Sequence, residues 1–287
     1  MNNNRRTVLS CIDGSHFSSA VVDYTAWIAS RVKAPVKLLH NIEHTGSPHI
    51  NLSGSLALGE REELLEELTE LESRRNKILR EQGKLMLDSA HRRLREAGVV
   101  ESEMLQRHGS LVDSLIDLEE ETRVLVLGVR GEAHENQEAA LGSQLEPVIR
   151  AMHRPVLVVN RPFEKAPERL MIAYDGRDAS RKALDMVAMS PLYEGLDCHL
   201  VQVGANSGSD KSILSEGVNI LEKVGMNVTG QNLTGDIEAA LLDYQDNHHI
   251  DLIVMGAFGH SRLREVLFGS MTLKMLSHSS MPLLLLR

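Results

Sequence analysis

The sequence predicts an α/β protein built from two tandem, open, doubly wound domains, each with a five-stranded parallel sheet. Three observations predict this class. The two halves of the chain repeat the same landmarks in the same order, short runs of Val, Leu and Ile alternate with helical patterns, and runs such as LIVMG and LLLL are apolar throughout. Strands that are apolar on both faces are typical of a central parallel sheet covered by helices on each side.

The repeat is visible in short motifs at matching positions, as expected when one structural unit is used twice. They pair as follows: Asp13-Gly14 with Asp175-Gly176, Gly128 and Gly131 with Gly256 and Gly259, Gly142-Ser143 with Gly269-Ser270, and Pro155 with Pro282. Prolines in the segment NRPFEKAPE mark a linker between the repeats. We therefore expect one domain at 1–164 and a second at 165–287.

The second half shows the expected elements most clearly. Strands are expected at 169–174, 197–203, 226–232, 251–256 and 282–287. Helices are expected near 178–189, 210–224, 235–248 and 269–279. In such a sheet, ligands bind at the carboxyl ends of the strands.

The first half carries an insertion. The distance from Asp13 to Gly128 is 115 residues, whereas that from Asp175 to Gly256 is 81, so about 34 residues are added, at about 44–80. A Gly/Ser-rich loop is followed by a helical pattern from Gly59, with leucines near coiled-coil spacing. Unbroken to Ala97, this helix would measure roughly 58 Å, so we expect it to bend or to project against a partner.

Charge and composition exclude several function classes. The formal net charge of −9 gives the molecule no overall electrostatic attraction for nucleic acid or for an anionic membrane surface. Cys11 and Cys198 lie in different halves, within apolar runs, and we expect two reduced, buried thiols. We expect neither a signal peptide nor a membrane span, and therefore a cytoplasmic protein.

The glycines of the second half suggest an anion site. Gly256 and Gly259 follow an apolar strand, where the absence of a Cβ lets another group approach the backbone. Gly269-Ser270 opens a helix, whose free N–H groups and dipole favour a phosphate. The nine residues between Gly259 and Gly269 include His260 and two arginines, Arg262 and Arg264. Glycine is common in turns, but two glycine elements at the same positions in both halves favour a binding site.

Neither familiar phosphate motif is present. The segment GAFGHS is not G-x-G-x-x-G, and GSLALGER lacks the Lys and Ser/Thr of a P-loop. Instead, Asp after the first strand combined with Gly-x2-Gly-x9-Gly-Ser after the fourth resembles the universal stress protein family, over essentially the whole chain. The resemblance implies an open α/β fold and ATP bound at the carboxyl edge of the sheet, with Mg2+ as a candidate companion on its phosphates.

The resemblance also implies roles for individual residues. Asp175 would accept a hydrogen bond from the base or ribose region, and the Val203 backbone would pair with adenine. The phosphates would be surrounded by N–H groups of these residues: Gly256, Gly259, His260, Gly269, Ser270 and Met271. An Asp-Gly pair after a strand is also a common turn, and the sequence alone leaves both readings of Asp175 open.

The first half departs from this pattern. Ten residues rather than nine separate Gly131 from Gly142, and they include Glu132, Glu135 and Glu138 in place of arginines. Each glutamate near a polyphosphate would cost about 1 kcal/mol or more. The degenerate set Asp13, Gly128, Gly131, Gly142 and Ser143 is therefore a relic, a site for another ligand, or structural, and we expect no ATP there.

The overall expectation is a regulatory or protective stress-response module. No general base for efficient hydrolysis is evident, and we assign no catalytic residue and no protein metal ligand; the pair His248-His249 reads as a solvated helix end. Two alternatives stay open: a slow ATPase, phosphotransferase or autokinase, and a nucleotide-free interaction scaffold. The Glu- and Leu-rich inserted helix leaves open a homodimer or another protein partner.

Overall fold

The structure is a computed structural model that describes residues 6–43, 58–131, 142–205, 207–256 and 270–287. The side chains of residues 58–63 and 270 lie outside this description. The predictions for Gly259, His260, Gly269, Arg262 and Arg264 therefore fall outside the described residues, as does the Gly/Ser-rich part of the insertion.

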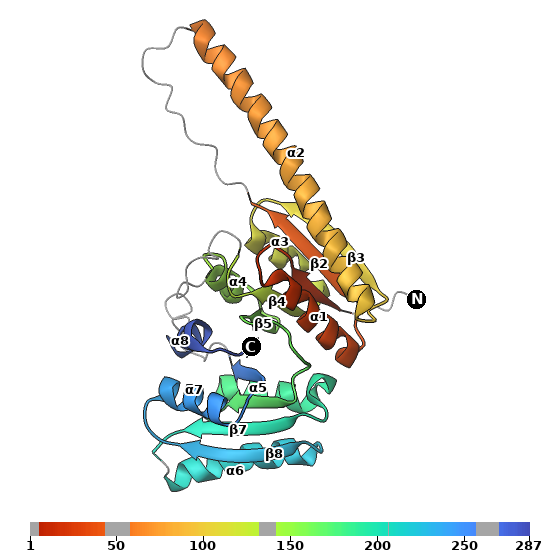
Figure 1. Cartoon of the computed structure of the whole chain (residues 1–287). Helices are drawn as coiled ribbons and strands as arrows, with labels where there is room; N and C mark the ends of the chain where they lie inside the picture. The colour runs from red at the N-terminus through yellow and green to blue at the C-terminus, as the bar shows by residue number, and fades with distance from the viewer. Residues whose placement is uncertain (1–5, 44–57, 132–141, 206, 257–269) are drawn as a thin grey trace.

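The described residues form one ten-stranded sheet of order β3-β2-β1-β4-β5-β10-β9-β6-β7-β8 (Figure 1). Five strands come from each half, and within a half all pairs are parallel. The strands of the first half are β1 (Thr7–Cys11), β2 (Val36–Ile42), β3 (Ser102–His108), β4 (Thr122–Gly128) and β5 (Val156–Val159). Those of the second half are β6 (Arg169–Ala173), β7 (Asp197–Val203), β8 (Asn227–Leu233), β9 (Leu252–Gly256) and β10 (Leu283–Leu286).

This arrangement confirms the predicted α/β class with a mostly parallel sheet. Each strand expected in the second half lies within one residue of the observed one. The sequence did not predict how the two halves meet: β5 and β10 pair antiparallel, with Leu157 opposite Leu284. The position of the boundary at 164/165 stays a prediction, although it falls in the connection between β5 and β6.

Helices cover both faces of the sheet. The core cluster on one face includes or contacts α1 (Ser18–Val32), α2 (Leu58–Glu96), α5 (Asp178–Met189) and α6 (Gly208–Lys223). The cluster on the other face includes or contacts α3 (Leu111–Leu118), α4 (Leu145–Ala151), α7 (Ile237–Asn247) and α8 (Ser270–His278). Two short 3-10 helices, η1 (Glu119–Glu121) and η3 (Pro191–Tyr193), lie between elements.

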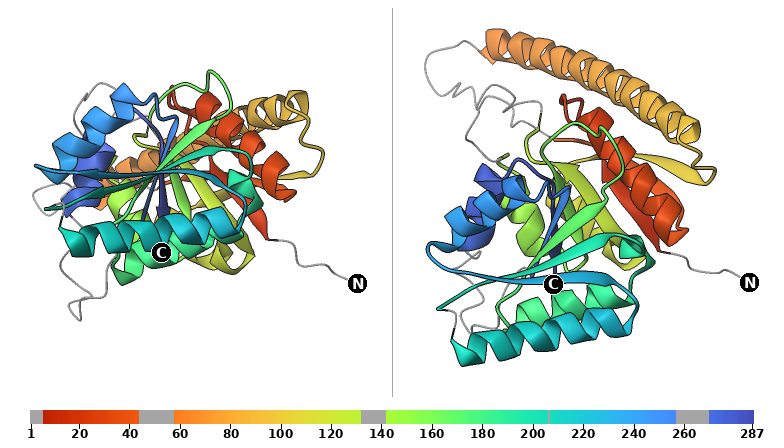
Figure 2. Two further views of the ribbon diagram at one scale, coloured as in Figure 1. Left: turned by 90° about the horizontal axis from the view of Figure 1, so that it is seen from below. Right: turned by 60° about the horizontal axis from the view of Figure 1, so that its bottom comes forward.

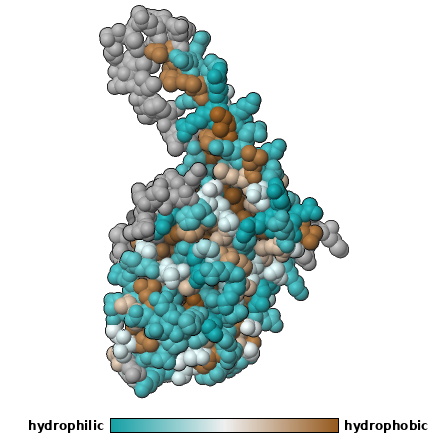
Figure 3. All heavy atoms as spheres, in the orientation of Figure 1, coloured by the Kyte–Doolittle hydropathy of each residue, from teal (hydrophilic) through white to brown (hydrophobic). Residues whose placement is uncertain are grey.

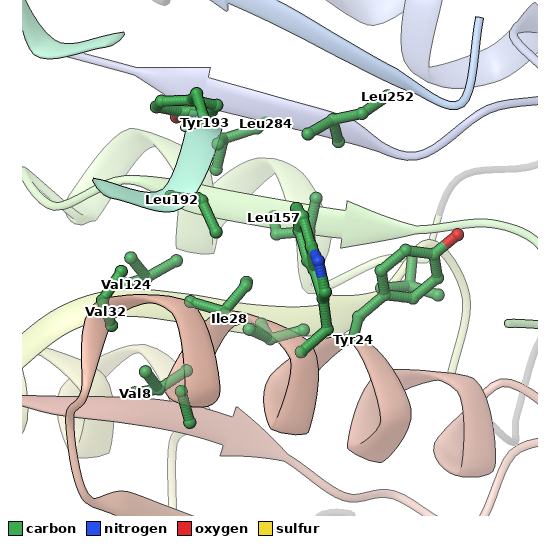
Figure 4. Close-up of a cluster of buried hydrophobic side chains, with 14 of the residues drawn as sticks. Val8, Tyr24, Ile28, Val32, Val124, Leu157, Leu192, Tyr193, Leu252 and Leu284 are labelled. Carbon is green, nitrogen blue, oxygen red and sulfur yellow. The ribbon is translucent and has the colours of Figure 1, made fainter. Parts of the chain in front are cut away.

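The strands supply side chains alternately to these two cores, because successive residues of a strand point to opposite faces. On β6, Leu170 and Ile172 belong to the first cluster and Met171 to the second. The first core also joins the two halves: Ile28 and Val32 of α1 gather with Leu192 and Tyr193 of η3 (Figure 4). The halves therefore share hydrophobic cores as well as a sheet.

Helix α2 is a single helix of 39 residues, so the inserted segment projects rather than bends. Its last part packs on the body, where Leu87, Ala90 and Leu94 are buried. Gly83 lies so close to the sheet that a Cβ there would meet His40 at 2.3 Å. The part before Arg75 stands away from the body, at the end of the molecule remote from α6 (Figures 1 and 2). Within the described residues, neither α2 nor any other helix is long and apolar enough to cross a membrane.

Candidate functional site

The carboxyl ends of the parallel strands define two candidate sites. Strands β1, β2 and β4 are neighbours in the first half, and β6, β7 and β9 are neighbours in the second. Because β5 and β10 are antiparallel, the strands of the two halves point in opposite directions. The two sets of predicted site residues therefore lie at opposite edges of the sheet.

Asp175 follows β6 at the edge of the second half and is held in a tight turn. Its Oδ1 accepts hydrogen bonds from Ser180 Oγ at 2.7 Å and from the Arg177 backbone N–H at 3.0 Å. Gly176 makes this turn with φ of +73°, a value that favours glycine. The Asp175 side chain is 54% exposed, so a ligand at this edge can still reach the carboxylate. Asp175 therefore shapes the turn, and its role in ligand binding stays a prediction.

Val203 and Gly256 end the strands on either side of β6. Val203 is the last residue of β7 and Gly256 the last of β9. A Cβ on Gly256 would lie 2.6 Å from the Ala179 carbonyl oxygen and 2.9 Å from the Ser180 nitrogen. Glycine is therefore required here by the first turn of α5, which crosses the strand end. That packing role does not depend on a phosphate, and the sequence did not reveal it.

Helix α8 begins at Ser270, directly after the predicted Gly269. Met271, in its first turn, packs against the hydrophobic core of the face that α7 and α8 cover. The Met271 side chain therefore contributes to this core, and the predicted role of its backbone N–H stays a prediction. The structure brings Asp175, Val203 and Gly256 to one edge of the sheet, and their assignment to a binding site stays a prediction.

Asp13 repeats the geometry of Asp175 in the first half. Its Oδ1 accepts from Ser18 Oγ and from the Ser15 backbone N–H, both at 3.0 Å. Gly14 makes the turn with φ of +81°. The two serines that anchor these carboxylates, Ser18 and Ser180, were missed from the sequence. Their signal was nevertheless present, because each follows its aspartate by five residues.

The predicted residues of the first half surround a single cavity of about 340 Å³. It is lined by all five of them, namely Asp13, Gly128, Gly131, Gly142 and Ser143. The cavity floor is rich in hydrophobic side chains from β1, β2 and β4, and its charged lining residues in the described part of the chain are Asp13, Glu43 and Arg75. Arg75 and Leu79 come from α2, so the insertion forms part of the wall. This contribution was also missed, because it depends on how a distant helix crosses the sheet.

The cavity does not contain an activated thiol. Cys11 lines it and is half-buried, not buried as expected, whereas Cys198 is buried as expected. Desolvation of the Cys11 thiol, together with the nearby carboxylate of Asp13, raises its pKa to about 12. Burial also raises the pKa of Cys198 to about 12. Both cysteines are free, and their thiols are protonated at neutral pH, which makes them poor nucleophiles.

The two adjacent histidines at the end of α7 differ in conformation. His248 stacks on Tyr244 with ring centroids 3.8 Å apart, and His249 has φ of +52°. Among the residues that the structure describes, no three His, Cys, Asp or Glu side chains form a metal-binding group.

Comparison with known proteins shows the family to which the chain belongs. The universal stress protein family matches residues 4–160 and 211–287, and the chain belongs to this family. The curated universal stress protein Slr1230 of Synechocystis is 35% identical over 287 residues, covering 98% of this chain and all of the relative. The expected family membership is thereby confirmed.

Solved structures agree with the fold. A universal stress protein of Archaeoglobus fulgidus aligns over 100% of this chain and 99% of its own, with a TM-score of 0.74 and 19% identity. A shorter universal stress protein, solved in complex with cAMP, aligns over 43% of this chain and 98% of its own, with a TM-score of 0.38 and 21% identity. At 19% identity the likeness to the Archaeoglobus protein concerns the fold alone. The cAMP is a ligand of the shorter protein.

Proposed function

We propose that this universal stress protein binds ATP at the carboxyl edge of its second half and acts in the stress response as a regulatory or protective module. The observation that carries the proposal is the convergence of Asp175, Val203 and Gly256 on three neighbouring strands. The start of α8 at Ser270 supports it, because a helix N-terminus there offers N–H groups to an anion.

The proposal assigns a role in ATP binding to each residue of the site. The exposed carboxylate of Asp175 accepts a hydrogen bond from a ribose hydroxyl, held in place by Ser180. The backbone at Val203 pairs with adenine. The N–H groups at Gly256, Gly259 and His260, and those at Gly269, Ser270 and Met271, surround the phosphates. A Mg2+ ion on these phosphates would neutralise part of their charge.

Turnover is expected to be slow. Of the carboxylates near this edge, Asp175 is engaged by Ser180 and by the Arg177 backbone. Asp210 is engaged in the capping box of α6, and hydrogen bonds from Ser207 hold the pKa of its carboxyl below the usual range. Neither group is therefore well suited to take a proton from an attacking water.

The first half is proposed to leave ATP unbound. Beside the aspartate that both halves share, its cavity presents the carboxylate of Glu43 together with the guanidinium of Arg75, and the adjoining sequence adds Glu132, Glu135 and Glu138. A polyphosphate would meet repulsion from several of these charges at once. We further propose a cytoplasmic location, because two free thiols fit a reducing compartment.

The experiment is to denature the freshly purified protein and identify any released nucleotide by mass. Intact ATP is the expected result. ADP or AMP would favour the slow ATPase or phosphotransferase, and no nucleotide, with no uptake of added ATP, would favour an interaction scaffold.

A pair of matched variants locates the site. Gly259→Val with Gly269→Val should abolish ATP retention, whereas Gly131→Val with Gly142→Val, the equivalent changes in the first half, should preserve it. Circular dichroism of each variant checks that the fold survives. Unchanged ATP retention in the first variant would refute the assignment of the site.

A further inference from the structure

Helix α2 presents hydrophobic side chains to solvent along its projecting part and along the stretch that follows it. Eleven large hydrophobic residues are exposed in the described chain, and five of them lie on this helix: Leu64, Leu65, Leu71, Ile78 and Leu85. Their exposed fractions rise from 40% at Leu64 to 68% at Leu85. In Figure 3, hydrophobic residues are visible among hydrophilic ones along this projection. A helix that projects from the body gains little stability from packing. Exposed hydrophobic side chains on such a helix are typical of a surface that binds a partner.

Four of these residues form a regular row. Leu64, Leu71, Ile78 and Leu85 are spaced seven residues apart, which is the length of a coiled-coil heptad; the row supplies one apolar position per heptad, whereas a full coiled-coil core has two. Leu85 lies two residues from Gly83 and from Leu87, which both face the sheet, so Leu85 is on the opposite side of the helix, and the other three residues are exposed as well. We call these four residues the α2 row.

The charges on α2 are segregated along its length. Residues 60–72 contain seven glutamates and one arginine, whereas residues 74–84 contain five lysines and arginines and one glutamate. Two copies packed in parallel would place one glutamate-rich segment against the other. Two antiparallel copies would place the acidic segment of each against the basic segment of the other.

We propose that the α2 row is a dimerisation surface, and that its occupant is the α2 row of a second copy of this chain in antiparallel orientation. The centre of the row lies between Arg74 and Arg75. An antiparallel register about that centre sets Leu64 beside Leu85 of the second copy and Leu71 beside Ile78. Such a pairing is twofold symmetric and closed, so it stops at a dimer. The bodies of the two copies then lie at opposite ends of the helix pair.

The test is sedimentation velocity of the full chain over a range of concentrations. We expect a dimer, and we expect Leu71→Gln with Ile78→Gln to raise its dissociation constant by roughly tenfold or more. Glutamine keeps a high helix propensity, and circular dichroism checks that α2 remains helical. Ile116→Gln is the matched control, since Ile116 is 49% exposed on α3, outside the row; it should leave the dissociation constant unchanged.

Orientation is tested separately by cross-linking. In an antiparallel pair, a mixture of Glu67→Cys and Gln82→Cys proteins should form a disulfide-linked dimer more readily than either protein alone. Readier cross-linking of each protein alone would show a parallel pair and overturn the proposed orientation. The proposal would be overturned if the protein stayed monomeric at all concentrations, or if the row substitutions left the dissociation constant of the dimer unchanged. In either case the α2 row would bind something other than a second copy.

Discussion

Ser18 and Ser180 are equivalent residues that each donate a hydrogen bond to the aspartate of their own half. If Asp175 contacts ATP, Ser180 is a positioning residue. We expect Ser180→Ala to weaken ATP binding roughly fivefold, or about 1 kcal/mol. This is less than the roughly 1.5–3 kcal/mol of a hydrogen bond to a charged group, because the Arg177 N–H still holds Asp175. Ser18→Ala should leave affinity unchanged. Calorimetric titration of both variants measures this, and equal losses would contradict the assignment of ATP to the second half.

Gly256 and Gly128 form a second matched pair, which separates packing from binding. A methyl group on Gly256 would meet backbone atoms of α5 at 2.6 Å, whereas one on Gly128 would meet its nearest atom at 3.2 Å. We expect Gly256→Ala to lower the free energy of unfolding by about 1–3 kcal/mol, as overpacking does, and Gly128→Ala to lower it less. Urea unfolding followed by circular dichroism decides. A larger loss of unfolding free energy for Gly128→Ala than for Gly256→Ala would show that the first turn of α5 does not constrain Gly256.

Among the elements, α8 is the one whose position matters most to the proposed site. Glu238 of α7 forms an ion pair with Lys274 of α8 and a hydrogen bond with His278 of the same helix. Hydrogen bonds from Lys274 and then from His278 hold the pKa of the Glu238 carboxyl below its usual range. A lowered carboxyl pKa stabilises the fold above the unfolded-state pKa, and that contribution is lost as the pH falls through the folded-state value.

We therefore expect Glu238→Gln to raise the rate of hydrogen exchange in residues 270–278 at neutral pH. We also expect the free energy of unfolding of this variant to fall less as the pH is lowered into the acid range. The control is Glu216→Gln, which breaks the equivalent pair between Glu216 of α6 and Arg181 of α5. That change should leave exchange in α8 as it is. If hydrogen exchange in α8 does not change in Glu238→Gln, the contacts of Glu238 with Lys274 and His278 do not stabilise this helix.

Most elements could be predicted because their signals are local. The runs LIVMG and LLLL identify strands, and the leucine spacing after Gly59 predicts a helix, although the sequence left open whether that helix bends. The pairing of β5 with β10 could not be predicted, because the sequence of an apolar strand does not specify the strand with which it pairs. The cavity wall supplied by Arg75 and Leu79 was missed for a similar reason: contacts across a long insertion leave no pattern in the sequence. Asp175 and Gly256 were singled out because a repeated motif marks them, and Val203 because the family resemblance implies a role for it. Their role in binding stays a prediction, and the packing role of Gly256 was not predicted.

At the scale of the whole molecule, the two halves are joined by one sheet and two shared cores. We expect them to unfold together, because separating β5 from β10 would expose apolar side chains on both. Trp27 is the chain's only tryptophan, and it lies in α1 of the first half. Its fluorescence and the far-ultraviolet circular dichroism of the whole chain should give coincident urea transitions.

A substitution in the other half sharpens this prediction. Leu284→Ala in β10 removes buried side-chain atoms and should lower the stability reported by Trp27 by about 2–5 kcal/mol. A Trp27 transition that does not respond to Leu284→Ala would show that the halves unfold independently.

The shared sheet also keeps the two candidate sites apart, at opposite edges, so a ligand can occupy one without touching the other. The most direct test of the account is titration of the full chain with ATP, together with hydrogen exchange of the bound and free protein. We predict one ATP per chain, with protection at residues 174–177, 203–205 and 270–278. Two ATP per chain, protection at residues 11–14 and 142–145 instead, or no binding at all would contradict it.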